Sequence, residues 1–261
     1  MDEFTVERDQ IDRRYESLRL PNKRQEKDLL DSISERGITQ PLYGIKKDEQ
    51  FILLDGFKRL RAGTKMNLEI FPALEIAETE REGMVKLLRL SNAKGLHFFE
   101  QVKIVNELHS TEKLTVRQIS ETLEKSSKWV GVRLGILKEF SDKVWEVVFE
   151  GKLPASMVLY TLRQMRRLHN VSKKDIDAFI DAVAGKNLGV RDLEVLAQGW
   201  FKGGDEMKEQ IKNGDLSWTI EKAKELHPKG TEKDFSENEA RVIKDLEIAQ
   251  KYMERLTSKL P

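Results

Sequence analysis

The most informative absence in this 261-residue chain is cysteine, of which it has none. Without cysteine there is no disulfide, no thiolate nucleophile, and no zinc or iron–sulfur site built on thiolates. The four histidines are scattered at positions 97, 109, 169 and 227, so no two of them form the i, i+4 pair of a helical metal site. These absences indicate a reducing compartment and argue against a metal centre held by cysteine or histidine.

Long apolar runs and an excess of one charge are also missing. No stretch of about 18 apolar residues occurs, and the N-terminus MDEFTVERDQIDRRYE is charged from its second residue. We therefore expect a cytoplasmic protein with no membrane span. Lys and Arg number 46 against 45 Asp and Glu, so affinity for an anionic partner has to come from local clusters of charge.

The N-terminal quarter of the chain mixes helix and strand signals. The segment EKDLLDSISERGI spaces its apolar residues as a helix does, and Gly37 stands where a left-handed C-cap residue is expected. Apolar runs at 51–54 and 70–76 predict two strands, with a short helix between them that begins at Gly56. From residue 78 onward apolar residues recur every three or four positions, which predicts helices.

The segment LTVRQISETLEKSSKWVGVRLGILKEF predicts two short helices joined by a tight polar turn. Thr115 suits the N-cap of the first helix, and Ser126 or Ser127 that of the second. This spacing is typical of a helix-turn-helix, whose second helix enters the DNA major groove, although a plain helical hairpin fits it equally well. The side chains from Ser126 to Trp129 and Arg133 are expected to be exposed. The candidate DNA contacts here are Thr115, Gln118, Ser126, Ser127, Lys128, Trp129 and Arg133.

A basic segment follows at residues 154–174, with five Lys and Arg and no acidic residue. Arg163, Arg166 and Arg167 stand at i, i+3 and i+4, so one helix face would present three guanidinium groups to phosphate oxygens. A solvated basic face is the alternative, but the position directly after the two-helix segment favours contact with the DNA backbone.

The last segment predicts an amphipathic helix over residues 236–260. Ser236 and Glu239 have the spacing of a capping box, and apolar residues follow at alternating steps of four and three. This helix would either pair with a second chain as a dimerisation helix or pack on the protein's own helices.

These features occur together in one family. The resemblance rests, in this order, on the runs SISERGITQPL and ILLDGFKRLRAG, the two-helix segment and the run FSDKVWEVVFEGKLPAS. Over roughly residues 11–162 the chain resembles the ParB partition proteins. The resemblance implies an α+β ParB/sulfiredoxin-like domain at residues 1–97, an all-α helix-turn-helix domain at 98–175 and a helical region at 176–261. The chain would be predominantly helical.

In ParB proteins the N-terminal domain binds CTP with Mg²⁺ and closes a clamp around DNA, and the resemblance places this function at the DGFKR turn. Gly56 lets a phosphate approach the backbone, and the nearby Lys and Arg side chains add cationic donors. A tight strand-to-helix turn with surface cations is the alternative. The candidate nucleotide-binding residues are Gln40, Pro41, Asp55, Gly56, Lys58, Arg59, Arg61 and Asn92.

Two family boxes are altered in this chain. Phe57 stands where the first phosphate box has glutamate, and Ser91 replaces the glutamate of the metal-binding E-N-x-Q-R box. Loss of the second carboxylate weakens a Mg²⁺ site and removes the obvious general base. We therefore do not expect an enzyme. CTP binding, or a residual CTPase activity, is the alternative. The arginine-rich box that contacts a ParA-type ATPase is not recognisable, so that partner is not expected either.

The leading interpretation is a sequence-specific DNA-binding protein of ParB type, acting in plasmid or chromosome partition or as a related transcriptional regulator. It would be nucleoid-associated and would bind a repeated or palindromic double-stranded target as a homodimer. A CTP-dependent DNA clamp is the alternative. A ParB-like nuclease is a third reading, for which Asp55 alone provides too few carboxylates.

Overall fold

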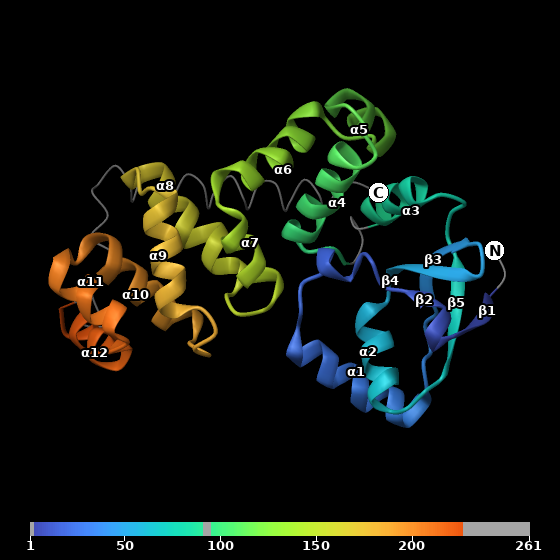
Figure 1. The fold of residues 1–261 in the computed structure, drawn as a ribbon, viewed down its shortest axis with the longest axis horizontal. Coiled ribbons are helices and arrows are strands. Elements are labelled where there is room, and N and C mark those ends of the chain that lie inside the picture. Colours follow the sequence, from blue (N-terminus) through green and yellow to red (C-terminus); the bar gives the residue numbers. More distant parts are fainter. Residues whose placement is uncertain (1–2, 91–94, 227–261) are drawn as a thin grey trace, which may run out of the picture.

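The computed structural model describes residues 3–90 and 95–226. A strand-rich part with helices α1 and α2 lies at one end of the molecule, α8–α12 lie at the other end, and α4–α6 lie between them (Figure 1). The strands are β1 (Glu3–Glu7), β2 (Ile11–Asp12), β3 (Leu42–Lys47), β4 (Gln50–Asp55) and β5 (Ile70–Glu75). The α-helices are α1 (Lys23–Arg36), α2 (Phe57–Lys65), α3 (Glu80–Leu90), α4 (Phe98–Ser110), α5 (Val116–Leu123), α6 (Ser127–Glu139), α7 (Asp142–Phe149), α8 (Arg163–His169), α9 (Lys173–Val183), α10 (Val190–Lys202), α11 (Gly204–Asn213) and α12 (Leu216–Leu226). Short 3₁₀ turns η1 (Arg8–Gln10) and η2 (Glu16–Leu18) precede α1, and a π-helical segment η3 (Met157–Leu162) leads into α8.

The five strands form one mixed sheet in the order β1-β5-β3-β4-β2. The apolar run predicted at residues 51–54 is β4, which pairs with β3 on one side and with the edge strand β2 on the other. Phe51 and Leu53 face one hydrophobic cluster together with Phe57 of α2, whereas Ile52 and Leu54 face a second cluster on the other side. Successive side chains of a strand point to opposite faces, so an unbroken apolar run is what a strand covered on both faces requires.

Three local predictions for this part are confirmed. Helix α1 ends at Gly37 as predicted, with a positive φ of +68°, although its ψ of −171° differs from that of the left-handed C-cap conformation expected there. Strands β4 and β5 occupy the two predicted apolar runs, and α2 lies between them with Gly56 as its N-cap. Strands β1, β2 and β3 were not predicted.

The helical part has two hydrophobic clusters that cross the predicted boundaries. One joins α3 to α4, α5 and α6 through Leu88, Val105, Ile119 and Val130, so α3 packs with helices that follow residue 97. The other runs from Phe99 of α4 through α7 and η3 to α10 and α12, without a break at residue 175.

A small mixed sheet followed by helices confirms the predicted fold class. Each helix that the structure describes is too short or too polar to cross a bilayer. Two predictions fall outside the described residues: the nucleotide contact Asn92 and the helix at 236–260.

Candidate functional site

A cavity of about 230 Å³ opens where β4 passes into α2. Gly56 makes this turn with φ +104° and ψ +11°, a left-handed conformation that favours glycine. A Cβ at this position would lie 2.8 Å from Cδ2 of Leu42, so any larger residue would also have to displace this buried side chain. Among residues 3–90 and 95–226, no side chain caps the first turn of α2, so within this described part its first N–H groups are available to an anion. The cavity is lined by Arg19, Leu29, Gln40, Asp55, Gly56, Phe57, Lys58, Arg59, Arg61, Gly95 and Glu100.

The fold brings several of the predicted nucleotide-binding residues together around Arg59. Its guanidinium donates to the backbone carbonyls of Gln40, at 3.0 Å, and Pro41, and lies 3.4 Å from Oδ2 of Asp55. It also lies over the ring of Tyr43, at 5.3 Å from the ring centroid. Arg59 therefore ties the Gln40–Pro41 segment to the start of α2.

Lys58 and Arg61 differ in what balances their charge. Nζ of Lys58 donates to the neutral Oε1 of Gln25 at 2.6 Å, and burial lowers its pKa below the ordinary value. Burial also acts to lower the pKa of Arg61, but hydrogen bonds to the carboxylates of Glu16 and Glu26 outweigh it and raise the pKa. Lys58 is the cation here that would gain most from an incoming phosphate, because its hydrogen-bond partner is uncharged.

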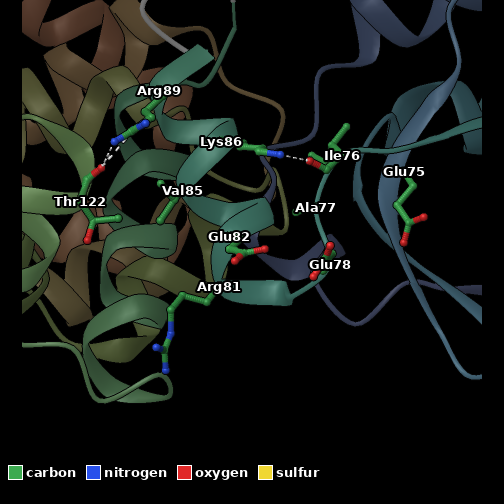
Figure 2. A pocket seen from close by; sticks show the side chains of 10 residues that line it. All are labelled: Glu75, Ile76, Ala77, Glu78, Arg81, Glu82, Val85, Lys86, Arg89 and Thr122. Atoms are coloured by element: carbon green, nitrogen blue, oxygen red, sulfur yellow. Dashed lines mark hydrogen bonds between the residues drawn. The ribbon is translucent and has the colours of Figure 1, made fainter. Parts of the chain in front are cut away.

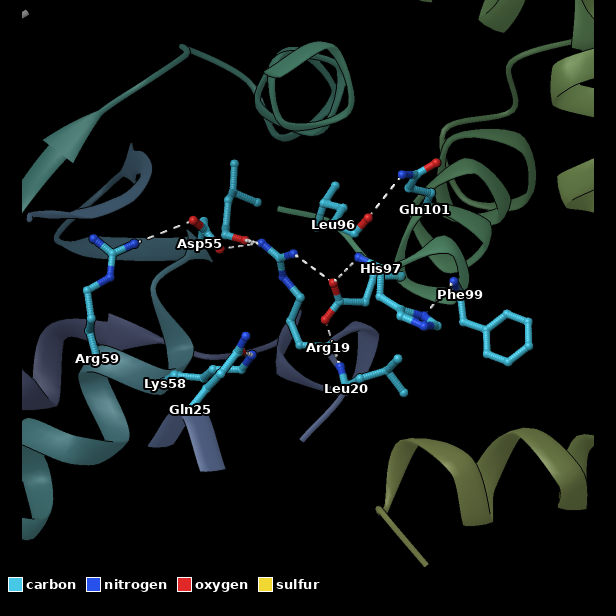
Figure 3. A network of polar contacts seen from close by, with 12 residues as sticks. Arg19, Leu20, Gln25, Asp55, Lys58, Arg59, Leu96, His97, Phe99 and Gln101 are labelled. Atoms are coloured by element: carbon cyan, nitrogen blue, oxygen red, sulfur yellow. Dashed lines mark hydrogen bonds and ion pairs between the residues drawn. The ribbon is translucent and has the colours of Figure 1, made fainter. Parts of the chain in front are cut away.

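Sequence reasoning missed two charged residues of the cavity, Arg19 and Glu100. Nη2 of Arg19 donates to Oδ1 of Asp55 at 2.6 Å and to the carbonyl of Leu54 at 3.0 Å (Figure 3). Its Nη1 lies 3.7 Å from Oε2 of Glu100. The two side chains thus link the DGFKR turn to the first turn of α4.

Glu100 is buried and its carboxylate accepts two backbone N–H groups, from Leu20 and from His97, each at 2.9 Å. The second bond closes a capping box at the start of α4, with His97 as the N-cap. The usual sequence signature of a capping box has Ser, Thr, Asp or Asn at the N-cap, so the histidine at position 97 hid this one. Arg19 follows a 3₁₀ turn and carries no comparable local signal.

A larger hollow of about 640 Å³ lies between the end of β5, α3 and α5 (Figure 2). Its cations already have partners within the protein: Nζ of Lys86 donates to the carbonyl of Ile76 at 2.5 Å, Nε of Arg89 to that of Thr122 at 3.0 Å, and Nε of Arg81 to Oε2 of Glu112 at 3.0 Å. The lining has three glutamates against two arginines and a lysine, which gives no net preference for an anion or a cation. The smaller cavity is therefore the better candidate for a charged ligand.

The two helices predicted between residues 115 and 139 are present as α5 and α6, with both predicted caps. Oγ1 of Thr115 accepts from the N–H of Gln118 at 3.3 Å, and Oγ of Ser126 accepts from the N–H of Trp129 at 3.1 Å. Oε1 of Gln118 accepts the N–H of Thr115 at 2.9 Å in return. The turn bends at Glu124, which adopts a left-handed conformation with φ +55°.

Exposure on α6 matches the prediction in part. Ser126, Ser127 and Lys128 are exposed, but Trp129 and Arg133 are half-buried, so the prediction of exposure was wrong for these two. The guanidinium of Arg133 stacks on the Trp129 ring, 3.3 Å from its centroid, and donates to Oε1 of Gln101 on α4 at 2.7 Å. Burial lowers the pKa of Arg133 to about 10.

The three arginines of the basic segment lie on α8, where two of them meet a carboxylate. Nε of Arg163 donates to Oε2 of Glu139 at 2.8 Å, and Nη2 of Arg167 to Oε1 of the same residue at 2.6 Å. Arg166 donates to the carbonyl of Val171 at 3.1 Å. The segment itself has no acid, but the end of α6 brings one to it from 24 and 28 residues earlier in the chain.

Comparison with known proteins extends the resemblance beyond these motifs. No family model matches the chain. A probable chromosome-partitioning protein ParB of Campylobacter jejuni is 26% identical over 173 residues, which is 66% of this chain and 59% of that protein. The chain therefore spans less than two thirds of that relative. This match confirms the similarity to ParB partition proteins that the motifs predicted.

Two solved structures of the C-terminally truncated ParB of Caulobacter crescentus also match. The complex with the centromeric parS site is 17% identical, with a TM-score of 0.36, and the match covers 81% of this chain and 98% of that one. The complex with CTP-γ-S is 18% identical, with a TM-score of 0.32, covering 70% of this chain and 99% of that one.

Proposed function

We propose that this chain is a DNA-binding protein of ParB type that reads double-stranded DNA with the α5–α6 unit, in partition or as a related transcriptional regulator. The observation that carries the proposal is the capped pair of helices, whose second member buries Val130 and Ile136 and exposes Ser127 and Lys128 in its first turn. In a helix-turn-helix, the first turn of the second helix holds the side chains that meet the base edges.

The charges around α6 support this assignment. Glu124 pairs with Arg89 at 2.9 Å, and Glu139 is held by two arginines of α8. Lys128 and Lys138 are both exposed and make no ion pair with any other residue that the structure describes. The surface charge left uncompensated on this helix is therefore positive, as contact with phosphate requires.

The experiment uses the full chain to select duplexes from a random DNA pool and then measures affinity by fluorescence anisotropy at several salt concentrations. Lys128→Ala is expected to weaken binding and to reduce the slope of log affinity against log salt by about 1. Lys186→Ala, which removes an exposed lysine between α9 and α10, is the matched control and should retain the wild-type slope. Equal slopes for both variants, or failure to select any duplex, would contradict the proposal.

The proposal also covers the symmetry of the DNA target and the location of the protein in the cell. Two copies of the chain would bind a repeated or palindromic site as a homodimer, and the protein would be associated with the nucleoid. Sedimentation of the full chain with and without a selected duplex tests the dimer. A single chain on each duplex would contradict it.

A second candidate function, CTP binding at the DGFKR turn, is favoured by the cavity at the start of α2. The uncapped helix N-terminus, Gly56 and the desolvated ammonium group of Lys58 together suit a phosphate. The two carboxylates of this cavity, Asp55 and Glu100, are both next to Arg19, so Mg²⁺ would be held mainly by the nucleotide phosphates.

Calorimetry with CTP, with and without a selected duplex, tests this second function. We expect wild-type protein to bind CTP and Lys58→Gln to bind it at least about tenfold more weakly, as loss of one charge-assisted hydrogen bond predicts. Lys65→Gln, at the opposite end of the same helix, is the matched control and should bind normally. The absence of heat with wild-type protein would leave DNA binding as the function.

A further inference from the structure

The outer face of α6 is polar in its first turn, and in its second turn it carries two glycines and a valine. Gly131, Val132 and Gly135 are all exposed, and Val132 keeps 42% of its surface accessible. Apart from the adjoining residues and the backbone of α6 itself, no atom in the described part of the chain lies within 4 Å of the place where a Cβ would stand on either glycine. The second turn therefore offers an outside partner a bare helix backbone and one isopropyl group.

The polar side chains that could otherwise cover this turn are held elsewhere. Arg133, the next residue along the helix, stacks on the Trp129 ring and donates to Gln101. The hydroxyl of Ser127 accepts a hydrogen bond from Ser120 of α5 at 3.2 Å. On this face, hydrogen bonds to DNA bases would therefore come from the first turn of α6, where Lys128 is the exposed basic residue.

Val132 lies four residues after Lys128, so the two side chains share one face of the helix, one turn apart. If the first turn enters the major groove, this spacing carries Val132 into the same groove. The feature of the major groove that an apolar side chain can read is the C5-methyl group of thymine. Scattered exposed apolar residues are ordinary, and Val132 differs from them by its place on this face.

We propose that Val132 is a specificity-determining residue that contacts a thymine methyl group, with Gly131 and Gly135 allowing the helix backbone to approach the DNA closely. This inference rests on the proposed function of α5–α6. It adds a base preference and names the side chain that sets it.

The test uses a duplex selected by the full chain and prepared either with thymine or with uracil, which lacks only the C5-methyl group. Wild-type protein is expected to bind the uracil duplex about fourfold more weakly for each contacted methyl group, the factor that burial of one methylene-sized group implies. In Val132→Ala this difference should disappear. Val190→Ala truncates the exposed valine at the start of α10, serves as the matched control and should keep the difference.

The outcomes separate this inference from the proposed function. Equal wild-type affinity for thymine and uracil duplexes, or a difference that Val132→Ala retains, overturns the role of Val132 while DNA binding stands. Failure to bind any selected duplex overturns both. Because the Val132 side chain is exposed and alanine favours a helix more than valine does, Val132→Ala should unfold at or slightly above the wild-type temperature, which checks that the fold is intact.

Discussion

Replacing Glu139 by glutamine shows whether the arginine face of α8 takes part in DNA binding. The Glu139 carboxylate accepts hydrogen bonds from both Arg163 and Arg167, so a DNA phosphate would have to compete with it for these two groups. Glutamine keeps the shape of the side chain but loses the charge. We therefore expect Glu139→Gln to bind DNA more tightly than wild type and with a steeper dependence on salt.

The size of this effect follows from the number of arginines released. Each additional phosphate contact on duplex DNA steepens the slope of log affinity against log salt by about 0.9, so two contacts add about 1.8. Over a rise from about 50 to about 200 mM salt, this slope reduces the advantage of the variant over wild type by about tenfold. The fold itself should lose about 1–2 kcal/mol, because a charged acceptor of two hydrogen bonds becomes neutral.

The loss of stability should depend on pH. Burial acts to raise the pKa of Glu139, but the hydrogen bonds from Arg163 and Arg167 outweigh it and hold the pKa below its ordinary value of 4.5. A carboxyl whose pKa is lower in the folded state stabilises the fold above the ordinary value and loses this contribution as pH falls through the lowered one. Wild type and Glu139→Gln should therefore differ in urea denaturation near neutral pH and converge in acid.

The DNA assay is an anisotropy titration at several salt concentrations, with Glu206→Gln as the matched control. Glu206 on α11 pairs with Lys222 at 3.1 Å, so the control makes the same change in net charge far from α6. If the two variants show the same affinity and the same salt slope, the arginines of α8 are structural and the backbone contact assigned to them is refuted.

Three further predictions concern the fold and the cavity. Gly131→Ala and Gly135→Ala should each stabilise the protein by about 0.5–1 kcal/mol in urea denaturation, since both positions are helical and open; destabilisation would show that this face is packed. Glu100→Ala should cost about 2–3 kcal/mol because two backbone N–H groups and Arg19 lose their acceptor, and a loss below about 1 kcal/mol would contradict that role. A bound phosphate should raise the lowered pKa of Lys58, so CTP binding should weaken as the pH rises through that lowered pKa, which calorimetry at several pH values measures; the same decline in Lys58→Gln would contradict it.

The sequence predicted the elements whose signals are local. Helix α2 was found because an apolar run, a glycine and a basic helix follow one another directly, and the caps Thr115 and Ser126 were found because a cap is set by its own side chain. Strands β1 and β2 read EFTVE and ID, are short and polar, and owe their conformation to pairing with β5 and β4.

The candidate site was predicted less well, because its charges are balanced by residues distant in the sequence. A helix-turn-helix pattern marks Arg133 as part of the second helix but does not show that Gln101 of α4 will receive its guanidinium. In the same way, the composition of residues 154–174 cannot show that Glu139 lies beside Arg163. Such pairs depend on how whole helices pack.

Amide hydrogen exchange of the full chain, with and without a selected duplex, tests the central claim most directly. The account predicts that DNA slows exchange in α5 and α6, over residues 116–139, with the strongest protection in the first two turns of α6. Exchange in α10–α12 should stay unchanged, because these helices lie at the far end of the molecule (Figure 1). Protection confined to α10–α12, or unchanged exchange in α6 under saturating DNA, would contradict the assignment of DNA reading to this pair of helices.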